Sequence, residues 1–241
     1  MTLQDVMIGE FPVDILIPAI CAGLLVIATH IPLGTQVLQR GIIFIDLAIA
    51  QVAGLGAYLV TMLLGKEAAA LWIQCGAVCL ALLASWLLVA TERLTARYQE
   101  PVIGIVFALA ATAVILLLAK DPQGGQHLSD LLAGQILWIS GAQILYSSIA
   151  TILLLVAMYL MRGRRGAFYS LFAIAITVSV QLVGVYLVFA TLIIPALSTV
   201  AIKSFRWRML ASYATAVTGY GCGLVGSALF DLPTGPLIVW T

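Results

Sequence analysis

Asp46 is the residue whose type and position most directly suggest chemistry. It lies inside the apolar run from Gly41 to Gly56, whereas the other acidic residues lie at the ends of apolar segments. A charge at membrane depth costs about 2.5 kcal/mol or more, so it persists where it faces protein or water and performs a task. A functional carboxylate is therefore the first hypothesis. The alternative is a structural carboxylate, paired with a backbone amide at a helix break or with Arg40, which is a poor partner at about 9 Å along an ideal helix.

The composition is that of a protein embedded in a membrane. Of the 241 residues, 63% are hydrophobic and 9% are charged, and the mean hydropathy is +1.16. Soluble domains carry about 25% charged residues. The net charge is near zero and no basic tract occurs, so nucleic acid is not an expected partner. The lipid bilayer is an expected partner. Residues 1–241 are predicted to form a single transmembrane domain.

The apolar segments predict the number of membrane crossings, because a spanning helix needs about 20 apolar residues. Gly184 and Pro195 interrupt the stretch 167–202, which is too long for one crossing, so we predict two short helices there. The fold class expected is an all-α polytopic bundle with about eight crossings. The segments are 13–30, 41–64, 69–91, 101–119, 143–161, 167–186, 187–202 and 208–229.

The basic residues predict the orientation, because positively charged loops stay in the cytoplasm. If the N-terminus is extracytoplasmic, every lysine and arginine except Lys66 and Lys120 lies on the inner side. The opposite orientation would leave only those two lysines inside. The inner residues would be Arg40, Arg93, Arg97, Arg162, Arg164, Arg165, Lys203, Arg206 and Arg208.

Other short motifs favour packing over chemistry. Cys75 and Cys79 are four residues apart and could grip a soft metal, but all four cysteines lie in apolar segments, where buried packing is the preferred interpretation. The run Gly221-Cys-Gly-Leu-Val-Gly226 matches a dinucleotide fingerprint that requires a preceding strand. Within a membrane segment, its Gly223 together with Gly219 instead indicates a close contact between helices.

The sequence does not favour an enzyme. No G-x-x-x-x-G-K-[ST] loop occurs, so ATP would have to be bound by a partner chain. His30 and His127 lie at segment ends and no H-E-x-x-H occurs, which argues against an intramembrane protease. In the loop after Lys120, His127 and Asp130 could meet on one helix turn as a metal-entry pair, with a solvated loop as the alternative. Gln135 follows as a polar group near membrane depth.

Five stretches occur in a characteristic order, namely 33–46, 101–109, 130–140, 183–196 and 231–239. Together they resemble the permease subunits of bacterial zinc and manganese ABC importers, which are related to the vitamin B12 and siderophore permeases. The resemblance implies a homodimer in a bacterial inner membrane. An extracytoplasmic metal-binding protein would feed it and ATPase subunits would drive it from the cytoplasm. No cofactor is implied beyond the transported ion.

The resemblance also implies a metal site. In the family, an Asp on the second helix and a His four residues later help to hold the metal. The Asp corresponds to Asp46, whereas position 50 is alanine and Gln51 is the nearest polar substitute. Gln51 would share an ion with Asp46 only on a broken or bulged helix, because five residues turn an ideal helix by about 140°.

Two connections depart from the family pattern. The inner segment that docks in the ATPase is reduced to 162–166, whose Arg162, Arg164 and Arg165 we still expect to face that partner. The family also continues past the stretch at Asp231 into another crossing, whereas this sequence ends at Thr241.

The leading hypothesis is therefore a permease subunit for a divalent metal ion, with zinc expected and manganese as the alternative. Asp46 would be the pathway ligand, Gln51 and Gln135 would line the pore, and His127 with Asp130 would form an outer entry. Two other classes stay open: an uncoupled membrane conduit or partner protein with the permease fold, and a secondary transporter that uses Asp46 as a proton relay.

Overall fold

The computed structural model describes residues 13–65, 69–119, 136–161 and 165–241. Every regular element in those ranges is helical, which confirms the predicted all-α class. The elements are α2 (Val13–Arg40), α3 (Ile45–Leu64), α4 (Ala70–Thr95), η1 (Ala96–Tyr98), α5 (Gln99–Leu118), η2 (Ile136–Trp138), α7 (Gly141–Leu160), α8 (Arg165–Val183), α9 (Val185–Ser198), α10 (Phe205–Phe230) and α11 (Thr234–Trp240).

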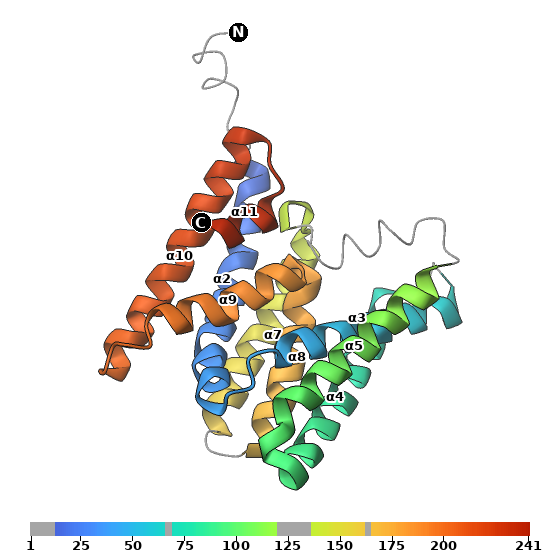
Figure 1. Ribbon diagram of the computed structural model, residues 1–241. Helices are drawn as coiled ribbons and strands as arrows, with labels where there is room; N and C mark the ends of the chain where they lie inside the picture. Colours follow the sequence, from blue (N-terminus) through green and yellow to red (C-terminus); the bar gives the residue numbers. More distant parts are fainter. Residues whose placement is uncertain (1–12, 66–68, 120–135, 162–164) are drawn as a thin grey trace.

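The helices form two groups that meet at α8 (Figure 1). In one group, α3 packs against both α4 and α5. In the other, α2 contacts α7, α9 and α10, and α11 packs on α9 and α10. α8 contacts members of both groups and is the most buried of the long apolar helices. The site described below lies where the two groups meet.

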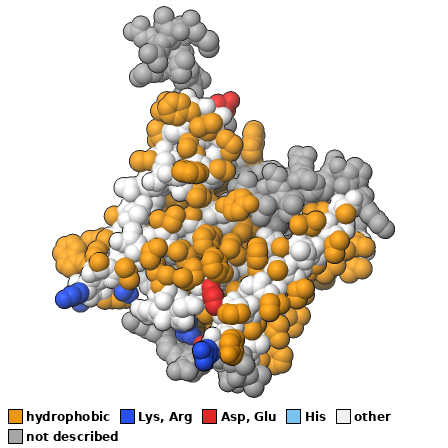
Figure 2. All heavy atoms as spheres, in the orientation of Figure 1, with side chains coloured by type: hydrophobic (Ala, Val, Ile, Leu, Met, Phe, Trp, Pro, Cys, Tyr) orange, Lys and Arg blue, Asp and Glu red, His pale blue; other side chains and the backbone are white. Residues whose placement is uncertain are grey.

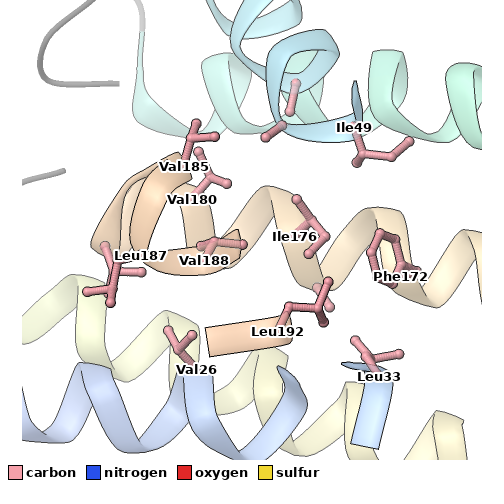
Figure 3. Packing of buried hydrophobic residues seen from close by; sticks show 14 of the residues in the cluster. Val26, Leu33, Ile49, Phe172, Ile176, Val180, Val185, Leu187, Val188 and Leu192 are labelled. Atoms are coloured by element: carbon pink, nitrogen blue, oxygen red, sulfur yellow. The ribbon is translucent and has the colours of Figure 1, made fainter. Parts of the chain in front are cut away.

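The buried core fills the space between the groups with branched and aromatic side chains. Figure 3 shows Phe172 and Ile176 of α8 between Ile49 of α3 on one side and Leu192 of α9 on the other. Each of these four side chains is at most 1% exposed. Because helices in a bilayer associate through close packing, we infer that α8 is the element that joins the groups.

The first helix runs past the predicted end at residue 30 to Arg40, so the predicted boundary is wrong. His30 lies inside this helix and is fully buried, and its Nδ1 is 2.9 Å from the carbonyl oxygen of Val26 one turn earlier. Pro32 has no N–H for the carbonyl of Ala28, and the Tyr213 hydroxyl of α10 donates to that oxygen at 3.4 Å. A neighbouring helix thus replaces the backbone hydrogen bond, as membrane helices with internal proline require.

The long apolar stretch 167–202 is divided at Gly184, as predicted. Gly184 has φ +80°, a conformation that glycine adopts at little cost, and it separates α8 from α9. Pro195 does not end a helix but lies inside α9. With 14 residues, α9 is about 21 Å long, shorter than the roughly 30 Å hydrocarbon core of a bilayer.

The glycine run in α10 serves helix packing. It does not form a nucleotide site. The G-x-G-x-x-G run lies inside α10 with no strand before it. A Cβ on Gly223 would lie 2.5 Å from Cγ1 and 2.6 Å from Cα of Ile238 on α11. The predicted packing role is therefore confirmed for Gly223, whereas at Gly219 the nearest such atom is 3.9 Å away.

The surface matches a protein surrounded by lipid. Hydrophobic side chains cover most of the face in Figure 2, with lysine and arginine side chains gathered along its lower part. Six of the described helices are long and apolar enough to cross a membrane: α2, α3, α4, α5, α7 and α8. The eight crossings and the outer N-terminus stay predictions.

Candidate functional site

Asp46 lies at the start of α3, just after the chain reverses direction. Gly41, with φ +68°, ends α2, and α3 begins at Ile45. Asp46 is therefore in the first turn of a helix, where the backbone dipole favours a negative charge. Its side chain is 1% exposed. No other side chain and no neighbouring helix donates a hydrogen bond to its carboxylate among the described residues, and only the backbone amides of Asp46 and Leu47, in its own first helical turn, act on it. Asp46 is thus a buried acid without a partner from another helix, and its oxygens are available to a cation.

Arg40 does not pair with Asp46. Its guanidinium carbon lies 4.2 Å from the centre of the Phe168 ring on α8, in a cation–π contact. The pairing with Arg40 is therefore not found, whereas the backbone amides at the start of α3 stay the structural alternative for Asp46.

Glu100, in the first turn of α5, is a second acid at this place. Its Oε1 accepts a hydrogen bond of 3.1 Å from the backbone N–H of Phe44, two residues before Asp46. Its Oε2 is buried and has no partner within the described part of the chain. The N-terminal turns of α3 and α5 thus meet with one carboxylate each, and both carboxylates keep unpaired oxygens.

Glu100 was not predicted from the sequence, because it lies at the end of an apolar segment, where an acidic residue is ordinary. A usable signal was present nevertheless. Glu100 directly precedes Pro101, and proline is favoured in the first turn of a helix. The pair therefore marks the start of a helix that carries an acid at its positive end, the same arrangement as Asp46 on α3.

An aromatic pair lies beside the two acids. The rings of Phe44 and Phe189 stack with their centres 6.2 Å apart and their planes 5° from parallel. Phe189 belongs to α9, so this short helix contacts the residue that precedes α3 and whose N–H donates to Glu100. Because Asp46 is fully buried in the single chain, an ion would reach it only after the surrounding helices separate.

Gln51 does not share a face of α3 with Asp46. The helix is regular from Ile45 to Leu64, with no break or bulge, so the two residues stay about 140° apart around its axis. Gln51 lies on the side of Tyr58, two turns later, whose hydroxyl reaches the Leu117 carbonyl of α5 at 3.5 Å. Within one chain, Gln51 therefore lies on a different side of α3 from Asp46.

Several predicted site residues fall outside the described part of the chain. They are His127, Asp130, Gln135, Arg162 and Arg164. Arg165 is the first residue of α8, and only its backbone is described.

The cysteines do not form a metal site in the described structure. Cys75, Cys79 and Cys222 are exposed on the surface of the chain, so the prediction that they pack inside it is wrong for these three. The reason is that α4 and α10 turn part of their apolar surface outward, where a thiol meets lipid or another chain. Among the described residues, no group of three or more His, Cys, Asp and Glu side chains is placed to hold a metal.

The comparisons with known proteins agree with this architecture. The sequence profile of the ABC 3 transport family matches residues 12–165 and 164–241. Among solved structures, PsaBC from Streptococcus pneumoniae in complex with Fab matches with a TM-score of 0.72 and 20% sequence identity. The match covers 99% of this chain and 90% of that one. At this identity the likeness supports the fold alone. No curated protein matches the sequence.

Proposed function

This chain belongs to the ABC 3 transport family, as its ordered sequence stretches predicted, and on that premise we propose that it carries a divalent metal ion inward through a homodimer. As a permease subunit of a metal-type ABC importer, it does not itself hydrolyse ATP. The observation that supports a metal pathway most directly is Asp46, a buried carboxylate that no other side chain and no neighbouring helix pairs with in the described structure. A buried ionised group without a partner is costly, and a bound cation removes that cost.

We propose Asp46 as the ligand in the pathway, with Glu100 as a second oxygen donor. Gln135 and the pair of His127 and Asp130 stay proposals for the route toward the outer face. A single carboxylate is a weak site, and two copies of the chain would bring two such acid pairs to one route. Gln51 takes no part in this site within a single chain.

The type of ligand bears on the choice between zinc and manganese. Zinc prefers nitrogen and sulfur ligands, whereas manganese suits carboxylates and water. Position 50, where the family has histidine, is a fully buried alanine. Asp46 and Glu100 offer only oxygen. We therefore propose manganese as the better-suited ion, in place of the zinc expected from the sequence.

Vesicle transport tests this function. The full chain would be co-expressed with its candidate ATPase subunit, purified in a mild detergent and reconstituted into vesicles. We expect a stable complex and accumulation of manganese that requires ATP, with a lower rate for zinc. Accumulation that follows a pH gradient and ignores ATP would instead support a proton relay at Asp46. Failure of any ATPase to co-purify would support the uncoupled conduit.

The role of Glu100 can be separated from its hydrogen bond to Phe44. Glu100→Gln keeps an oxygen that accepts from the Phe44 N–H but removes the charge. We expect manganese uptake to fall about tenfold or more, because replacing a group that only supports a metal ligand already costs about 10–100-fold. The measurement is the initial rate of ATP-driven uptake in vesicles, together with the melting temperature, which should stay unchanged.

Two companion variants complete this test. Glu100→Ala removes both the charge and the acceptor, so it should lose uptake and also melt earlier. Glu92→Gln makes the same chemical change on α4 and should leave uptake near the wild-type rate. Equal uptake by Glu100→Gln and the wild type would exclude Glu100 from the pathway.

A further inference from the structure

A groove of about 560 Å³ runs along the C-terminal part of α2. Leu33 and Arg40 of α2 lie along it, Leu155 of α7 lines one side, and Phe205 and Met209 at the start of α10 line another. Its volume falls within the range of about 300–1,000 Å³ that is usual for small-molecule sites. The groove is separate from the acids at the start of α3 and plays no part in the function proposed above.

The two ends of the groove differ in chemistry. Gln36, Gln39 and Arg40 form a polar end, and the same three residues line an adjoining hollow of about 400 Å³. Away from this end the lining is apolar, with Leu155 and Met209 as examples. A cation and amides at one end, followed by an apolar channel, match the shape and chemistry of an amphiphile with an anionic head.

Arg40 is available to an anion in this arrangement. One face of its guanidinium stacks on the Phe168 ring at 4.2 Å, which holds the group in place. The edge of a stacked guanidinium still carries its N–H donors, whose fork geometry fits a phosphate. Glu92 lines the adjoining hollow, but no ion pair joins Arg40 to a carboxylate among the described side chains.

The groove is also accessible from the bilayer. It lies beside α7, the least buried of the six long apolar helices, whose Leu153, Tyr159 and Leu160 are exposed. Arg40 is the last residue of α2, at the end predicted to lie at the cytoplasmic face. Basic pockets between transmembrane helices on that side are typical sites for acidic lipid head groups.

We propose that this groove binds an anionic phospholipid. Arg40, with the amides of Gln36 and Gln39, would hold the phosphate, and an acyl chain would lie along Leu155 and Met209. A lipid without net charge would bind less well, because the cation in its head group offsets the attraction to Arg40. The bound lipid would fill the space between α7 and α10 at the inner end of the chain.

Native mass spectrometry of the detergent-purified full chain tests this proposal. Dioleoyl phosphatidylglycerol would be titrated against dioleoyl phosphatidylcholine. We expect one phosphatidylglycerol per chain to bind more tightly than phosphatidylcholine. Arg40→Gln should lower that affinity about fivefold or more, the contribution expected of one basic residue near a lipid head group. Arg97→Gln, which removes another arginine that lies near an aromatic ring, should leave it unchanged.

Each remaining outcome bears on the proposal. Equal affinity for the two lipids, or an equal loss in both arginine variants, would overturn it. Competition by millimolar inorganic phosphate alone would reduce the site to a phosphate site without a lipid. If Arg40→Gln aggregates, Leu155→Trp narrows the apolar channel with Arg40 intact. Loss of phosphatidylglycerol in that variant supports the proposal, and full retention contradicts it.

Discussion

Asp46→Asn is expected to abolish metal accumulation while the chain stays folded in the membrane. Asparagine has nearly the same shape as aspartate, so the packing at the start of α3 should be kept. The charge that would attract the ion is removed, together with one ligand oxygen. Residues that only support a metal ligand cost about 10–100-fold when they are replaced, so a direct ligand should cost at least as much. The measurement is ATP-driven manganese uptake, with membrane expression and melting temperature recorded for the same preparations.

Asp231→Asn is the matched control. Asp231 ends α10 in the left-handed conformation, with φ 52°, which asparagine tolerates well. The variant therefore makes the same chemical change at an exposed position without backbone strain. Uptake should stay close to the wild-type rate. Wild-type uptake by Asp46→Asn would remove Asp46 from the pathway and leave a helical permease fold with an unidentified route.

Gly34→Ala is expected to have the largest effect on stability. A Cβ at position 34 would overlap the backbone carbonyl oxygen of Leu192 on α9 and would lie 3.4 Å from the Cβ of Ala196. A backbone atom cannot turn aside as a side chain does, so α2 and α9 would have to separate. Overpacking typically costs about 1–3 kcal/mol, and we expect the upper end of that range. The measurement is the melting temperature of the purified chain in detergent.

Gly221→Ala is the control for this experiment. Gly221 also lies inside a long helix, α10, but a Cβ there meets no atom within 4 Å. Its melting temperature should equal that of the wild type or lie slightly above it, because alanine is favoured over glycine inside a helix. A Gly34→Ala chain as stable as Gly221→Ala would show that α2 and α9 do not cross as closely as described here.

The helices could be predicted because hydropathy and special backbone positions are local properties of the sequence. The break at Gly184 followed from a length limit and from Gly184 and Pro195, of which only Gly184 separates two helices. The end of α2 could not be predicted in this way, since Pro32 is tolerated through the hydroxyl of Tyr213, a residue far away in the sequence. Likewise, the exposure of Cys75 depends on how α4 packs, which its apolar neighbours do not specify.

The site was only partly predictable for a similar reason. Asp46 was identifiable because a charge inside an apolar run is rare. Glu100 was not identified, because its proximity to the start of α3 depends on how α3 and α5 pack. The regularity of α3 places Gln51 on another side of the helix from Asp46, and the sequence alone had left a bulge open as an alternative.

The backbone contact between Gly34 and Leu192 restricts how the protein can move. Because no side chain lies between them, α2 and α9 are in direct contact where they cross. We therefore expect these two helices to move together. α9 also carries Phe189, whose ring stacks on Phe44 just before α3 begins. Any opening toward Asp46 would then come from α3, α4 and α5 moving outward as one group. In that scheme α2 and α9 stay in place, and the helices that carry Asp46 and Glu100 move.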